Sequence, residues 1–164
     1  MADDVNNGVK QFNWIDYKWC NGAYDTLTKY NTNSYYGSID NLTTLELEDD
    51  VAYVSDKTCR MPTKADLEEL TANTTSTWET LNGVNGRRFT SKTNGNSIFV
   101  PAAGYCSNGS VYDVGSYGNL WSSSLDESDS RLAWYLFFGS DIMDVGNYVS
   151  RYYGFTVRAV KDTK

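Results

Sequence analysis

The chain has 164 residues, which is enough for one domain with a real hydrophobic core. Its 21 acidic residues outnumber its 14 basic residues, and the resulting net charge of −7 argues against binding to nucleic acid or to an anionic membrane. The absence of histidine excludes Ser–His–Asp and Cys–His catalytic sites, and any zinc site that needs an imidazole.

The start of the chain is polar and acidic and does not resemble a signal peptide, and no apolar run approaches the roughly 20 residues that span a bilayer. We therefore expect no membrane insertion, and either synthesis in the cytosol or an origin as one domain of a longer protein. The three cysteines, Cys20, Cys59 and Cys106, include no Cys-x-x-C spacing. We expect three free, partly buried thiols; the alternative is one disulfide bond and one free thiol.

The first half of the chain predicts one strand and two helices. Aromatic residues between 12 and 19, followed by many Asn, Thr and Tyr, predict a strand and then a long polar loop. Residues 45–55 predict a short helix, because Leu47, Val51 and Val54 fall on one apolar face. Acidic residues at 48–50 crowd its first turn, which the helix dipole favours; a calcium site is the alternative interpretation of these acids.

The second helix has the clearer signal, over residues 60–70. Thr63 stands at the N-cap and Asp66 follows three residues later, the spacing of a capping box. Met61 and Leu67 occupy the positions of a hydrophobic staple, and Leu67 and Leu70 are expected to face the core.

From Gly83 onward the pattern is typical of strands. Residues 87–91 and 97–100 flank Asn94-Gly95, a pair favoured in type I′ turns, and predict a β-hairpin. Further strands are expected around 120–122, along 133–138 and, with half-buried alternation, over 154–160. The segment 139–153 between them is irregular, polar and aromatic. Two early helices and later antiparallel strands predict an α+β class, in a single domain spanning residues 1–164.

Six segments together resemble one known family. They read DNLTTLELEDDVA at 40–52, RMPTKADLEEL at 60–70, NGVNG at 82–86, TSKTNGNSIFVPAAG at 90–104, LWSSS at 120–124 and GFTVR at 154–158. They are similar, in order, to the Fibrobacter succinogenes major paralogous domain, which is common in gut Bacteroidetes and their phages. The resemblance extends over residues 31–160. It implies a C-type-lectin-like fold with two short helices and an antiparallel β-sheet.

Some members of this family are variable proteins of diversity-generating retroelements, in which error-prone copying at adenines rewrites the 3′ end of the gene. The resemblance therefore implies a ligand-binding module rather than an enzyme, whose hypervariable face recognises a cell-surface protein or glycan. It implies a location outside the cell, on a bacterial surface adhesin or a phage tail tip, as the C-terminal part of a longer protein. It implies no cofactor and no metal. Oligomeric display would raise a weak affinity through avidity.

The resemblance also selects candidate ligand-binding residues in the last third of the chain. Trp134 and Met143 cannot arise from a diversified AAC-type codon and are expected to be fixed or to lie outside the diversified set. Phe137 has a core position as its alternative interpretation, and Tyr152 and Tyr153 have a sheet-edge position. The candidates, all reachable from such a codon, are Asn119, Leu120, Arg131, Leu132, Phe137, Gly139, Asp141, Asp144, Asn147, Tyr148, Tyr152 and Tyr153.

The chain departs from two related groups. Sugar-binding C-type lectins carry a Glu-Pro-Asn calcium loop and a Trp-Asn-Asp strand, whereas the comparable strand here reads LWSS at 120–123, so calcium-dependent sugar binding is not implied. Formylglycine-generating enzymes need a closely paired reactive cysteine couple, which the three cysteines do not reproduce. Two alternatives to a variable binding module stay open: a structural or assembly domain without diversification and, less favoured, an enzyme of the formylglycine-generating type.

Overall fold

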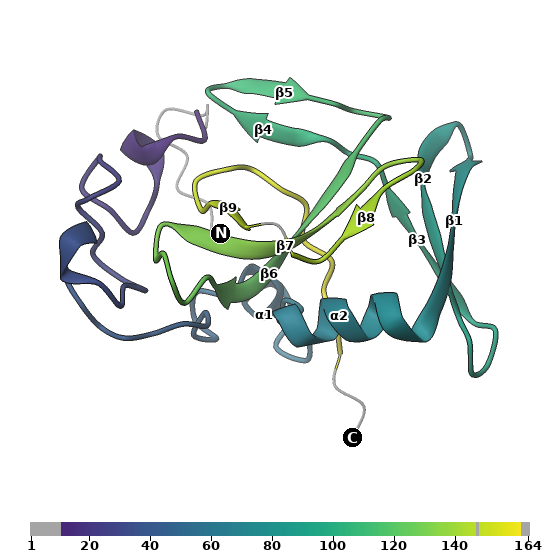
Figure 1. The fold of residues 1–164 in the computed structure, drawn as a ribbon, viewed down its shortest axis with the longest axis horizontal. Coiled ribbons are helices and arrows are strands. Elements are labelled where there is room, and N and C mark those ends of the chain that lie inside the picture. The colour runs from purple at the N-terminus through teal and green to yellow at the C-terminus, as the bar shows by residue number, and fades with distance from the viewer. Residues whose placement is uncertain (1–10, 147, 162–164) are drawn as a thin grey trace.

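The computed structural model describes residues 11–146 and 148–161, and within them the chain is α+β, as predicted. Two helices, α1 (Val51–Ser55) and α2 (Lys64–Asn73), precede strands that pair antiparallel throughout (Figure 1). No helix among the described residues is both long enough and apolar enough to cross a bilayer. Cys20, Cys59 and Cys106 are free thiols, as predicted.

The strands form two sheets and a separate hairpin. The first sheet has the order β1–β2–β3, and β4 and β5 form a two-stranded hairpin of their own. In the second sheet β7 is central, because it pairs with β6 on one edge and with both β8 and β9 on the other. The strands are β1 (Thr74–Leu81), β2 (Val84–Ser91), β3 (Ser97–Pro101), β4 (Tyr105–Ser107), β5 (Ser110–Tyr112), β6 (Gly118–Leu125), β7 (Leu132–Phe138), β8 (Met143–Asp144) and β9 (Tyr148–Ser150).

The capping box of α2 is confirmed. The Thr63 side chain accepts a hydrogen bond from the Asp66 amide at 3.2 Å, and the Asp66 carboxylate accepts one from the Thr63 amide at 2.7 Å. Arg60 adds an ion pair to Asp66 at 2.6 Å. Two of the orphan amides of the first turn are thereby satisfied, which fixes where the helix begins.

The first predicted helix is shorter than expected. Asp50 is its N-cap and accepts from the amides of Ala52 and Tyr53, so residues 45–50 precede the helix. Leu47 and Val54 are 50% and 49% exposed, and Ala52 is the buried residue of α1, so the predicted apolar face is wrong. The acids act as a cap and as ion-pair partners, and the described residues contain no cluster that could hold a metal ion.

The strand predicted near the N-terminus is also wrong. Residues 14–16 form a 3-10 turn, η1 (Trp14–Asp16), because the Asn13 side chain accepts from the Asp16 amide and caps it. A second 3-10 turn, η2 (Ser34–Tyr36), interrupts the long irregular segment that follows. Figure 1 shows these segments gathered on one side of the molecule.

The hairpin of β2 and β3 is confirmed, but its turn differs from the prediction. Gly95 has a φ of 73° whereas Asn94 has no positive φ, and the Gly95 amide donates to the Ser91 carbonyl in a longer loop. A type I′ turn needs positive φ at both central residues. That condition is met in the two-residue loops Asn82-Gly83 and Asn108-Gly109, which join β1 to β2 and β4 to β5. Strand β1 was not predicted.

The predicted strand over residues 154–160 is not a regular strand. The segment makes single bridges, successively to Cys106, Leu120 and Arg60. It changes partner every few residues, so no continuous ladder of hydrogen bonds can form. Through these single bridges it connects β4, β6 and the residues just before α2.

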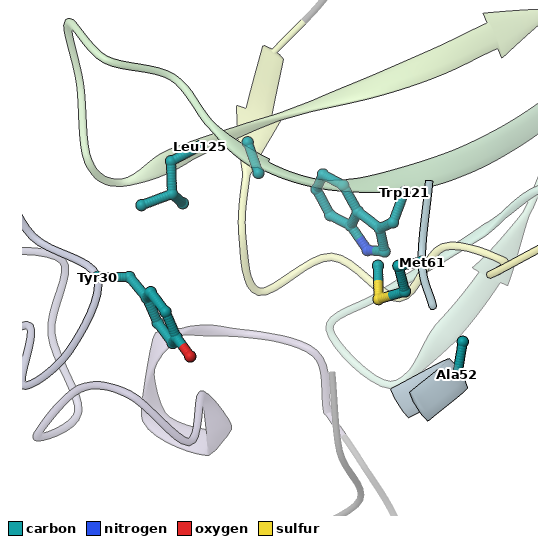
Figure 2. Close-up of a cluster of buried hydrophobic side chains, with 6 residues drawn as sticks. Tyr30, Ala52, Met61, Trp121 and Leu125 are labelled. Carbon is teal, nitrogen blue, oxygen red and sulfur yellow. The ribbon is translucent and has the colours of Figure 1, made fainter. Parts of the chain in front are cut away.

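Two core clusters lie on either side of β6 and β7. Because alternate strand residues face opposite ways, β7 contributes Ala133 to one cluster and Leu136 and Phe138 to the other. Figure 2 shows the first cluster, where side chains from the N-terminal segment and α1 meet those of β6. The first cluster contains Tyr30, Ala52, Met61, Trp121, Leu125 and Ala133, and the second contains Leu67, Phe89, Val100, Leu120, Leu136 and Phe138.

Candidate ligand-binding surface

Aromatic side chains from four parts of the chain meet on one side of the second sheet. The β4–β5 hairpin, the turn before β6, strand β7 and the loop after β9 each contribute rings. In Figure 1 the hairpin projects on the side of the molecule opposite α2, with β6 and β7 between them. We call this set the tyrosine surface; it consists of Tyr105, Tyr112, Tyr117, Tyr135, Phe137, Tyr152 and Tyr153.

The aromatic rings of the β4–β5 hairpin contact those of the loop after β9. Tyr105 stacks on Tyr112 with ring centroids 5.2 Å apart, and its other contacts reach Tyr153 at 5.7 Å and Phe155 at 6.3 Å. Tyr153 in turn stacks on Tyr152 at 4.7 Å. Offset-stacked and edge-on pairs at these separations are favourable, so the rings support one another.

The β7 rings extend the same surface. Tyr135 and Phe137 are two residues apart and therefore share one face of the strand. Tyr135 lies 4.9 Å from Phe155, and Phe137 stacks on Tyr117 at 5.1 Å, measured between centroids. Asp144 is the register partner of Phe137 on β8, so its carboxylate is expected on that face.

Backbone hydrogen bonds hold the hairpin against the loop after β9. Cys106 and Gly154 exchange two of them, at 2.8 and 2.9 Å, and the Trp121 indole donates to the Tyr153 carbonyl at 3.1 Å. A Cβ atom at Gly154 would stand 2.8 Å from the Cys106 Cβ, so the close approach of the two chains requires glycine. These contacts place Tyr105 beside Tyr153.

The hydroxyl groups of Tyr105, Tyr135 and Tyr152 stay neutral at physiological pH, because the pKa of each is raised. Burial, followed by the charge of Asp113, raises the pKa of Tyr105, and burial followed by the charge of Asp144 raises that of Tyr135. Burial and a hydrogen bond with Tyr153 raise the pKa of Tyr152 to about 12. Each hydroxyl can therefore both donate and accept a hydrogen bond.

Part of the surface is open to solvent. Tyr112 is 43% exposed and Tyr117 38% exposed, while the other five rings are half-buried. A hollow of about 380 Å³ opens beside them, and its lining includes Ala103, Tyr105 and Tyr153. A partner could thus contact both a ring and its hydroxyl group.

Four of the predicted candidates contribute to this region: Phe137, Asp144, Tyr152 and Tyr153. Asp141 is exposed in the turn just before β8. Asn147 lies outside the described residues.

Three further candidates lie elsewhere on the molecule. Tyr148 is the register partner of Trp134 and contacts it edge-on at 5.7 Å, on the opposite face of β7 from Tyr135. Leu132 shares that opposite face. Arg131 is held by the Asp129 carboxylate and lies over the Tyr36 ring at 4.3 Å. The twelve candidates therefore do not form one continuous surface.

The remaining candidates are buried, so the expectation that they lie on an exposed face is wrong for them. Asn119 is 4% exposed and donates its side-chain amide to the Gly104 carbonyl, and Leu120 is 3% exposed within the second core cluster. Gly139 is buried beneath the Tyr117 ring, and its carbonyl accepts from the Arg87 guanidinium at 2.9 Å. These residues build the scaffold.

The sequence interpretation missed Tyr105, Tyr112, Tyr117 and Tyr135. For Tyr135 a signal existed, because it stands two residues from Phe137 in a predicted strand. For Tyr105 and Tyr112 the signal was Asn108-Gly109, a favoured hairpin turn that brings its flanking residues together.

The groups that the tyrosine surface offers for noncovalent contact are aromatic rings, hydroxyls and carboxylates. Cys106 lies next to Tyr105 and is half-buried, with no imidazole in the chain to activate it.

No protein-family model, curated protein or solved structure matches the chain. The function is therefore argued from the geometry of this surface.

Proposed function

We propose that the chain is a ligand-binding module that recognises a cell-surface protein or glycan through the tyrosine surface. The observation that carries the proposal is the set of seven partly exposed rings brought together from four segments on one side of the sheet. Tyrosine provides a large, rigid contact area at low entropic cost, and its hydroxyl adds hydrogen bonds.

The same proposal includes the C-type-lectin-like fold and membership of the Fibrobacter succinogenes major paralogous domain family. Two short helices, antiparallel sheets and a long irregular segment before α1 support it. On this basis the module would be diversified by a retroelement and displayed, in several copies, on a bacterial surface or a phage tail tip. Its work would be recognition and not catalysis.

The tyrosine surface is built so that its exposed residues could be substituted without unfolding the chain. Its rings rest on a core that includes Trp121 and Phe155, whose stacked rings are 4.4 Å apart. Substitutions at exposed positions usually change stability by only about ±0.5 kcal/mol. Exposed side chains such as Tyr112 could therefore vary while the core keeps the backbone in place.

The test is binding of the labelled chain to intact cells from a panel of gut bacterial species. We expect Tyr112→Ser combined with Tyr117→Ser to abolish binding to any species that the unchanged chain binds. The matched control replaces Tyr35 and Tyr148, which are also exposed but lie away from the tyrosine surface. Unchanged binding by the first variant would refute the proposal.

A second observation separates a diversified module from a structural or assembly domain. The DNA beside the gene is inspected for a near-copy of its 3′ end that differs mainly at adenines. Such a copy is expected under the proposal. Its absence, together with no binding to any cell, would favour the structural alternative.

A further inference from the structure

The segments that carry the tyrosine surface contain exposed carboxylates and no exposed cation. The nearby Arg87 is buried, and its guanidinium donates to the carbonyls of Gly139 and Ser140. Residues 103–118 contain no lysine or arginine, and residues 132–157 contain only Arg151. Arg151 is 2% exposed, and its guanidinium donates to the carbonyls of Tyr30 and Lys29. The exposed charges of these segments are the carboxylates Asp113, Asp141 and Asp144.

Two of these carboxylates lie beside the rings. Asp113 follows Tyr112 directly and its carbonyl accepts from the Tyr117 amide, and Asp144 is the register partner of Phe137. After burial, which is the largest cause, Asp113 contributes to the raised pKa of Tyr105, and Asp144 to that of Tyr135. A carboxylate that disfavours ionisation of a phenol creates a negative potential at that ring. The face of an aromatic ring is itself electron-rich, so both features favour a positively charged partner.

Elsewhere in the described chain, aromatic rings already hold cations. Lys64 lies 3.4 Å above the Trp134 ring, Lys57 lies 4.3 Å above the Tyr53 ring, and Lys18 lies 4.3 Å above the Trp19 ring. Such contacts are attractive within about 6 Å of the ring centroid. None of the seven rings of the tyrosine surface is involved in a contact of this kind with a described cation.

We propose that the tyrosine surface binds a basic segment of a partner protein, whose arginine or lysine side chains lie on its rings beside Asp113 and Asp144. This inference rests on the proposed function and names the class of ligand. The net charge of −7 would speed the encounter with a basic partner. The aromatic rings would contribute contact area, and the two carboxylates would favour a positively charged side chain over a neutral one.

The experiment is an NMR titration of the full chain with the peptide acetyl-Gly-Arg-Gly-Arg-Gly-amide. Its matched probe contains citrulline in place of arginine, which keeps the shape of the side chain and removes the charge. We expect the arginine peptide to shift the resonances of Tyr105, Tyr112 and Tyr135, and to bind more weakly as salt is added. Tyr112→Leu is expected to weaken binding roughly 2- to 30-fold, the range of one cation–π contact. Equal binding of the citrulline peptide would overturn the inference.

The charge contribution is tested by Asp113→Asn combined with Asp144→Asn. Asp113 has a φ of 59°, a conformation that asparagine also adopts readily, so this change suits the backbone. The control pair, Asp25→Asn with Glu48→Gln, removes as many charges from exposed positions elsewhere. The first pair is expected to weaken binding roughly 2- to 30-fold more than the control pair does, the range of two exposed ion pairs. An equal loss in both pairs would indicate nonspecific attraction and overturn the inference.

The failure of this inference can be distinguished from failure of the proposed function. If the variant Tyr112→Ser with Tyr117→Ser loses cell binding while the Asp113 and Asp144 variants keep it, and a neutral oligosaccharide competes, the ligand is a glycan. The proposed function then stands and the basic partner is refuted. If that tyrosine variant binds cells normally, the proposed function itself fails.

Discussion

Asp66 provides the sharpest test of how the scaffold is stabilised. Its carboxylate accepts hydrogen bonds from the Thr63 amide and hydroxyl, both at 2.7 Å, and from the Arg60 guanidinium at 2.6 and 3.3 Å. The Arg60 interaction is the largest cause that lowers its pKa from 3.8 to about 2. We predict that Asp66→Asn, which removes the charge but keeps the size, destabilises the fold.

The magnitude follows from the shifted pKa and from the exposure of the group. Lowering the pKa of Asp66 from 3.8 to about 2 corresponds to at most about 2.5 kcal/mol of unfolding free energy. The side chain is 30% exposed, so solvent screening reduces this figure. Loss of an N-cap interaction costs about 0.5–2 kcal/mol. We therefore expect a loss of about 1–2 kcal/mol at pH 7.

The assay is urea denaturation of both proteins from pH 7 down to pH 2. Because the pKa of Asp66 is lower in the folded protein than in the unfolded chain, its carboxylate stabilises the fold above about pH 4. This contribution is lost as the pH falls from about 4 to about 2, so the two stability curves should converge there. Glu69→Gln, at an exposed position of the same helix, is the control and should change little. A difference between Asp66→Asn and the unchanged chain that stays constant down to pH 2 would refute the electrostatic reasoning.

Two further predictions concern the scaffold beneath the tyrosine surface. Gly154→Ala should lower the midpoint of urea denaturation by an amount equivalent to about 1–3 kcal/mol, because the new Cβ would press on the Phe12 ring and the Cys106 Cβ at 2.5 and 2.8 Å. Leu120→Asn should cost at least about 2 kcal/mol in the same assay, whereas Tyr148→Asn at an exposed position should cost within about 1 kcal/mol. Equal effects of the last two changes would contradict the burial described for them.

The parts of the fold that could be predicted are those determined by neighbouring residues. Thr63 and Asp66 alone specify the start of α2, because each satisfies an orphan amide of the other. The hairpin of β2 and β3 could be predicted from the strand-like segments 87–91 and 97–100 on either side of the turn pair Asn94-Gly95. The turn itself differs, since Ser91 bonds across a longer loop and only Gly95 adopts a positive φ.

The parts that could not be predicted depend on distant partners. The acids before α1 suggested an early helix start, but Asp49 instead binds Lys29 at 2.6 Å and the Tyr30 hydroxyl at 2.6 Å. Residues 154–160 alternate like a strand, yet their partners come from three separate segments. Contacts with residues far apart in the chain leave no pattern in the neighbouring sequence from which they could be predicted.

The positions of the candidate residues, exposed or buried, follow from the geometry of β6 and β7. Codon reachability selects residue types, whereas burial is decided by the alternation of side chains along β6 and β7 and by what covers each face. Phe137 and Tyr135 point to the face that the β4–β5 hairpin and the loop after β9 leave partly open, while Leu136 between them is fully buried. Leu120 lies in the same core cluster as Leu136, so it belongs to the scaffold although its codon could vary. A prediction of which candidate residues are exposed therefore needs the strand register in addition to the codon rule.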